Sequence, residues 1–158
     1  MAACSPTFDW REVRAESAGL RAMLPCKPDK ESRMLPMAGR QVKVEMLGCE
    51  AGGATFAVLS ADIGDPALAG EVLAQWKTST LARLRSSAPP EAPFRPPGAL
   101  ALLQSLRVTA TGQRADGSRV ESEAAYFARG GRVFQAVIYA GQLKPEVADP
   151  FFSGLKFE

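Results

Sequence analysis

Hydrophobic and polar residues alternate along most of the chain, as they do in strands that bury one face. The alternation predicts strands at residues 19–25, 31–37, 40–50, 54–63, 103–113, 119–129 and 132–141. Glycine-containing pairs at 38–39, 116–117 and 130–131 separate successive strands, and such pairs suit hairpin loops that need positive φ. The sequence therefore predicts an antiparallel sheet.

The pattern changes to a helical period between residues 65 and 85. Apolar residues recur there every three or four positions, and Trp76 lies on the apolar stripe as a core residue. Asp65 suits the N-cap of this helix, and Pro66 suits its first turn, where a backbone N–H has no partner. We expect this segment to be the long helix of the domain.

Two further segments complete the predicted fold. The proline-rich segment 86–99 can neither continue a helix nor enter a central strand, so we expect a stiff connection. A second Asp-Pro pair, at 149–150, predicts the start of a short terminal helix. The predicted fold class is α+β: an antiparallel sheet with the long helix on one face and the terminal helix completing the cover, as in an α/β/α sandwich.

The last two hairpins predict which residues share a face of the sheet. If both loops have two residues, Ala115 lies opposite Ser118 and Arg129 lies opposite Arg132. One face is then apolar, and we expect the long helix to cover it. The other face is mixed, and its aromatic, amide and guanidinium groups make it a candidate binding face; the alternative is a half-exposed face partly covered by the terminal helix. The candidate binding residues are Arg107, Tyr126, Gln135 and Tyr139.

Composition narrows the possible functions. The net charge of +2, with scattered arginines, does not favour nucleic-acid binding. The chain has no histidine, which removes imidazole catalysis and histidine metal ligation. We therefore predict no catalytic residue, cofactor or metal. Glu121 and Glu123 lie two residues apart on the apolar face, and they are the first suspects of the alternative, an enzyme that uses carboxylates or a metal.

Two of the three cysteines come close together in the predicted sheet. The hairpin at residues 38–39 brings Cys49 near Cys26, so strand geometry permits a disulfide. Two buried reduced thiols are the alternative. A disulfide would require an oxidising compartment.

The third cysteine suggests a membrane anchor. The segment Ala-Ala-Cys resembles the end of a bacterial lipoprotein signal, in which the cysteine is lipidated. Cys4 is then the lipidated residue, residues 1–12 are a tether, and residues 13–158 form a single domain. This interpretation predicts a lipid-anchored protein of the bacterial envelope that faces the periplasm. The alternative is a cytoplasmic protein that begins Met-Ala-Ala-Cys.

The order of elements resembles the Mog1/PsbP-like group of α/β/α sandwiches. The resemblance rests on GLRAMLPCKPDK near the start and on YFARGGRVFQAVIYAG followed by ADPFFSGLKF at the end. It implies a fold that serves binding more often than catalysis, and it transfers no functional residue. We therefore expect a periplasmic binding or assembly module whose partner is an envelope protein or a small ligand, with membrane contact only through the lipid.

Overall fold

The computed structural model describes residues 7–86 and 89–158, which form two antiparallel sheets and two α-helices. The strands are β1 (Arg11–Ala15), β2 (Leu20–Leu24), β3 (Asp29–Met37), β4 (Arg40–Ala51), β5 (Ala54–Asp62), β6 (Glu91–Pro93), β7 (Leu106–Gln113), β8 (Arg119–Arg129), β9 (Arg132–Ala140) and β10 (Lys156–Phe157). The helices are α1 (Ala69–Arg83) and α2 (Pro145–Ser153), with 3-10 turns η1 (Glu16–Ala18) and η2 (Pro66–Leu68).

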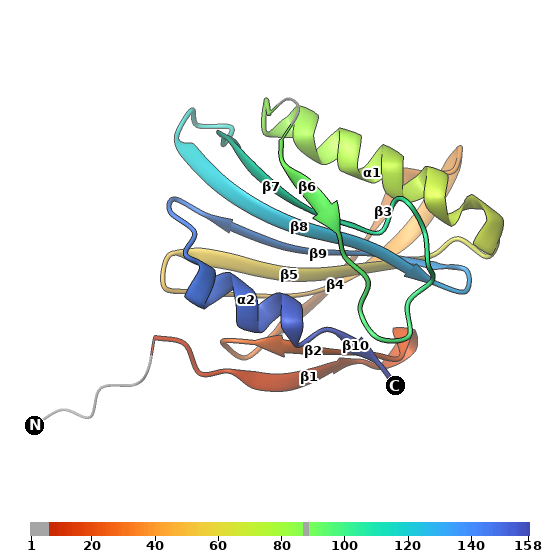
Figure 1. The fold of residues 1–158 in the computed structure, drawn as a ribbon, viewed down its shortest axis with the longest axis horizontal. Helices are drawn as coiled ribbons and strands as arrows, with labels where there is room; N and C mark the ends of the chain where they lie inside the picture. The colour runs from red at the N-terminus through yellow and green to blue at the C-terminus, as the bar shows by residue number, and fades with distance from the viewer. Residues whose placement is uncertain (1–6, 87–88) are drawn as a thin grey trace, which may run out of the picture.

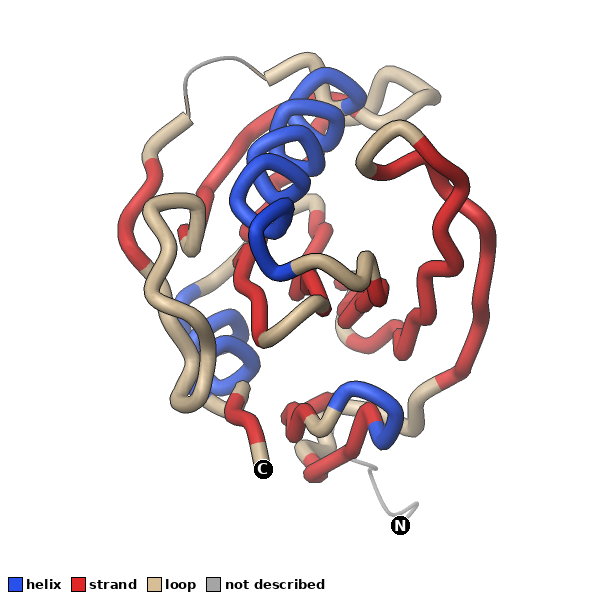
Figure 2. Tube along the Cα trace, turned by 90° about the vertical axis from the view of Figure 1, so that its right-hand side faces the viewer, coloured by secondary structure: helices blue, strands red, loops and turns tan. Residues whose placement is uncertain are grey.

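The large sheet has the strand order β3-β4-β5-β9-β8-β7-β6, and the small sheet has the order β1-β2-β10. Helix α1 lies on one face of the large sheet, whereas α2 and the small sheet lie on the other (Figure 1). Figure 2 shows the large sheet curving around α1, so we call the α1 side the inner face and the opposite side the outer face. The predicted α+β fold is confirmed.

Apolar side chains fill both faces of the central strands. On the inner face, Val72, Leu73 and Trp76 of α1 pack against alternate residues of the large sheet. On the outer face, Phe127 and Phe134 stack with ring centroids 5.0 Å apart, and they belong to a core that includes the buried aromatics of α2. Because β8 and β9 are covered on both faces, they are almost continuously buried.

The start of the long helix follows its sequence signal. The backbone N–H of Ala67 donates to Asp65 Oδ1 at 2.9 Å, and Pro66 occupies the first helical turn. The first turn is a 3-10 turn that continues into α1. The Asp65 cap is therefore confirmed.

The β7–β8 hairpin differs from the prediction by one residue. Its loop has three residues, because Arg114 pairs with Ser118 rather than Ala115 with Ser118. The Asp116 carboxylate accepts hydrogen bonds from the Ser118 backbone N–H and hydroxyl, and Gly117 has φ of +86°. A one-residue slip turns every β7 side chain to the opposite face. The β8–β9 hairpin has the predicted register, with Arg129 opposite Arg132.

Two boundaries also differ from the prediction. The terminal helix begins at Pro145, so Pro150 lies inside α2 rather than at its start. The predicted tether ends too late, because Arg11 and Glu12 belong to β1 and Trp10 packs on the outer-face core. The proline-rich connection contains the short edge strand β6.

Candidate functional site

The four residues of the predicted binding face do not form one exposed surface. Tyr126 and Gln135 are 1% and 2% exposed, because α1 covers the inner face on which they lie. Tyr139 is half-buried on that face, whereas the register slip places Arg107 on the outer face. The long helix thus covers the face that we predicted to be open.

Tyr126 and Gln135 hold α1 on the sheet. The Gln135 Nε2 donates to Thr80 Oγ1 of α1 at 3.0 Å and to the Tyr126 hydroxyl oxygen at 2.9 Å. Burial raises the pKa of the Tyr126 hydroxyl, against smaller opposing effects of its hydrogen bonds and of Arg83. This buried network has a structural role, because polar groups without water need such partners.

Arg107 joins Glu123, one of the two suspected acidic residues, to Asp149 of α2. Its Nε lies 2.8 Å from Glu123 Oε1, its Nη2 lies 3.2 Å from Asp149 Oδ1, and its guanidinium lies over the Phe152 ring. Glu121 accepts a hydrogen bond of 2.7 Å from the Leu143 N–H. Arg107 thus links α2 to the sheet through Asp149, and Glu121 holds the segment that precedes α2. Both contacts lie beside a cleft of about 230 Å³.

The Cys26 and Cys49 thiols form a disulfide in the structure, with their Cα atoms 6.0 Å apart. Cys26 lies in the β2–β3 connection, and Cys49 lies on β4. The bond therefore ties the connection between the two sheets to the large sheet. Cys4 lies outside the described residues.

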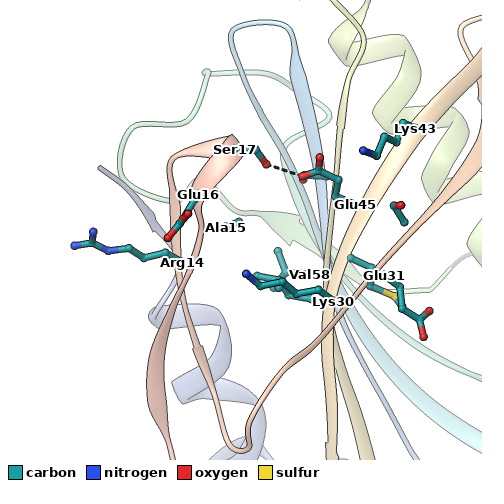
Figure 3. Close-up of a pocket in the computed structure, with 13 residues that line it drawn as sticks. Arg14, Ala15, Glu16, Ser17, Lys30, Glu31, Lys43, Glu45 and Val58 are labelled. Carbon is teal, nitrogen blue, oxygen red and sulfur yellow. Dashed lines mark hydrogen bonds between the residues drawn. The ribbon is translucent and has the colours of Figure 1, made fainter.

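A cleft of about 440 Å³ lies between the two sheets, and we call it the inter-sheet cleft. The end of β1 and η1 form one wall, and β3, β4 and β5 form the other (Figure 3). Leu47 and Val58, which lie opposite each other on β4 and β5, give it an apolar floor. Buried Ser60 adds a hydroxyl group to this floor.

The cleft carries charges of both signs. Glu45 is central, because it lies opposite Ser32 on one neighbouring strand and Ser60 on the other. The Ser17 hydroxyl on the opposite wall donates a hydrogen bond of 2.5 Å to Glu45 Oε2. Figure 3 marks this bond with a dashed line. The sequence alone did not single out this carboxylate, since an alternating Lys-x-Glu pattern is also typical of a solvated strand face.

Two lysines complete the cleft. Lys30 on β3 and Lys43 on β4 line the same cavity as Glu45. Within residues 7–86 and 89–158, neither lysine forms an ion pair. Arg14, by contrast, forms an ion pair, because its Nε lies 3.0 Å from Glu158 Oε1. The cleft thus offers two unpaired ammonium groups and the central Glu45 carboxylate above an apolar floor, and the Glu16 and Glu31 carboxylates also line it.

Neither a protein-family model nor a curated protein matches this sequence. The resemblance to the Mog1/PsbP-like group stays a prediction. Across the described part of the chain, no helix is long and apolar enough to cross a membrane. In the same residues, no group of three or more cysteine or acidic side chains is placed to hold a metal ion.

Proposed function

We propose that the protein is a non-enzymatic binding module that holds a small zwitterionic ligand, such as an amino acid or a short peptide, in the inter-sheet cleft. The observation that carries this proposal is the arrangement of Lys30, Lys43 and Glu45 in the inter-sheet cleft. A ligand carboxylate suits the two ammonium groups, and a ligand ammonium suits Glu45. Charge-assisted hydrogen bonds of this kind are stronger than those between neutral groups.

The proposed location is the periplasmic side of a bacterial envelope, with a lipid on Cys4. The Cys26–Cys49 disulfide supports an oxidising compartment. The anchor is tested separately from ligand binding: the protein is produced from its native gene in cells fed an alkyne-bearing fatty acid. We expect label on the native protein and none on the Cys4→Ser variant. Equal labelling of both proteins would contradict the anchor.

Isothermal titration calorimetry tests the binding proposal with four probes. Glycyl-glutamate and free glutamate carry both charges, whereas succinate carries only negative charge and ethanolamine only positive charge. We expect the first two probes to bind more tightly than the last two. Absence of heat with all four probes at millimolar concentration would reject the proposed ligand class.

Matched variants locate the binding site. Glu45→Gln removes the partner of the ligand ammonium, and Lys30→Gln with Lys43→Gln removes the partners of its carboxylate. Each change should weaken binding about tenfold or more, because a hydrogen bond to a charged group contributes about 1.5–3 kcal/mol. Glu50→Gln changes an exposed residue of β4 outside the cleft, so it should leave the affinity unchanged. Equal affinities of the Glu45 and Glu50 variants would place the site elsewhere.

A further inference from the structure

The inner face of the large sheet is only partly covered by α1. The helix contacts β8 and β9, while β3 and β4 curve away beside it (Figure 2). Leu35 on β3, Met46 on β4 and Leu59 on β5 therefore stay half-buried at the margin of the inner-face core. These side chains form an apolar surface that no described segment of the chain covers completely.

Two cavities of about 240 Å³ each lie along this surface. Both are lined by Leu35, Trp76 and Arg83, so we treat them as one feature and call it the inner groove. Its remaining walls are mainly apolar or aromatic, and they include Val44 and Tyr139. A concave apolar surface with few polar groups is the usual character of a site for a small apolar ligand.

The charged groups at the groove indicate which charge one end of such a ligand carries. Arg83 is exposed, lines both cavities, and makes no ion pair with any described residue. Arg33 lines one cavity, and only a loose 3.8 Å contact between exposed groups joins it to Glu31. The groove therefore combines an apolar wall with a surplus of positive charge.

Arg83 also lies close to the half-buried tyrosine of the groove. Burial raises the pKa of the Tyr139 hydroxyl, and the positive charge of Arg83 opposes that rise. A carboxylate can accept two hydrogen bonds from a guanidinium and a third from a neighbouring neutral tyrosine hydroxyl. This geometry favours an anionic head group at the Arg83 end of the groove.

We infer that the inner groove binds a single-chain anionic amphiphile, a fatty-acid-like molecule whose chain lies against Trp76 and whose carboxylate pairs with Arg83. This site lies on the opposite face of the large sheet from the inter-sheet cleft. The two sites share the edge residues Glu31, Ser32 and Met46. The residues that carry each proposal are separate, because Lys30, Lys43 and Glu45 line only the cleft, whereas Trp76 and Arg83 line only the groove. The proposal for either site can be disproved without affecting the other proposal.

Tryptophan fluorescence tests the inference directly, because Trp76 lines the groove and the second tryptophan, Trp10, packs on the outer face. The probe is 12-bromododecanoate, whose bromine quenches a tryptophan that it contacts, used below its micelle concentration. In a Trp10→Phe background, we expect saturable quenching of Trp76. In a Trp76→Phe background, the remaining Trp10 signal should not change.

Charge variants and a second probe test the head-group contact. Arg83→Glu should weaken binding at least tenfold, whereas Arg95→Glu, an exposed arginine outside the groove, should leave it within twofold. Bromododecylamine, with the same chain and an ammonium group, should bind at least tenfold more weakly than the acid. Both substitutions are at exposed positions, so the variants should fold.

Several results would overturn the inference. Unsaturable quenching would indicate contact without a site, and equal quenching of Trp10 and Trp76 would place the probe elsewhere. Equal affinity for the acid and the amine, or for the Arg83 and Arg95 variants, would reject the anionic head group. Absence of quenching in the Trp10→Phe background would reject the site altogether.

Discussion

Removing the Cys26–Cys49 disulfide should destabilise the protein strongly. The bond joins residues separated by 23 positions, so it restricts a sizeable loop of the unfolded chain. In the chain-entropy treatment, closing a loop of this length contributes about 3 kcal/mol to the free energy of unfolding. The Cys26→Ser, Cys49→Ser double variant should lose about this amount. It should still fold, because the bond closes only one end of a well-packed core.

Urea denaturation measures this loss. With a slope of about 2 kcal/mol per molar urea, a loss of 3 kcal/mol lowers the midpoint by about 1.5 M. Dithiothreitol should lower the midpoint of the native protein by a similar amount and leave the double variant unchanged. Thiol titration of the unfolded, non-reduced chain should find Cys4 as the only reactive cysteine, if no lipid is attached.

Two results would refute this reasoning. Three free thiols in the unfolded, non-reduced protein would show that Cys26 and Cys49 do not form a disulfide. A midpoint that is unaffected by dithiothreitol, despite a titrated disulfide, would show that the loop constraint does not stabilise the fold. The first result would also remove the support for an oxidising compartment.

Two further predictions concern the inner face. A Cβ atom at Gly112 would overlap the backbone carbonyl oxygen of Leu84, so Gly112→Ala should lower the free energy of unfolding by about 1–3 kcal/mol in urea denaturation. Gly141 has open space around it, so Gly141→Ala should be nearly neutral. Equal effects of the two substitutions would contradict the close packing at Gly112. Burial raises the pKa of Tyr126, so the folded state keeps the hydroxyl proton to a higher pH than the unfolded state does. The stability that comes from the neutral, buried hydroxyl is therefore complete below about pH 10 and is lost above it. Tyr126→Phe should lose about 1 kcal/mol at pH 8 but show a shallower decline between pH 9 and 11, and an unchanged decline would exclude Tyr126 as a source of the pH dependence.

Local signals predicted most of the elements. Ala38 and Gly39 both have positive φ, so the turn between β3 and β4 has the conformation that a two-residue hairpin needs. Asp65 and Pro66 correctly predicted the start of the long helix. In each case, neighbouring residues determine the structure, and a sequence pattern can report it.

The predictions are wrong where the local sequence is compatible with more than one structure. Asp116-Gly117 suits a two-residue loop, but the Asp116–Ser118 hydrogen bonds accompany a three-residue loop, which shifts the register by one position. Strands β8 and β9 are apolar on both faces, so alternation could not show which face α1 covers. Phe8 and Trp10 lie in a polar stretch that resembled a tether, yet both pack on the outer-face core.

The candidate sites depend on contacts between distant parts of the sequence. Ser17, Lys30, Glu45 and Ser60 meet in one cleft because the small sheet lies beside β3, β4 and β5. No spacing along the chain brings these residues together. The fold must therefore be known before the site can be recognised.

The central claim is that the inter-sheet cleft binds a small zwitterion, and chemical-shift mapping tests it most directly. Amide signals of the ¹⁵N-labelled protein are followed during titration with glycyl-glutamate. We predict saturable shifts concentrated in the cleft-lining residues, which are residues 14–17, 30–32, 43, 45–47, 58 and 60. Saturable shifts concentrated elsewhere, or no shifts at millimolar dipeptide, would contradict the claim.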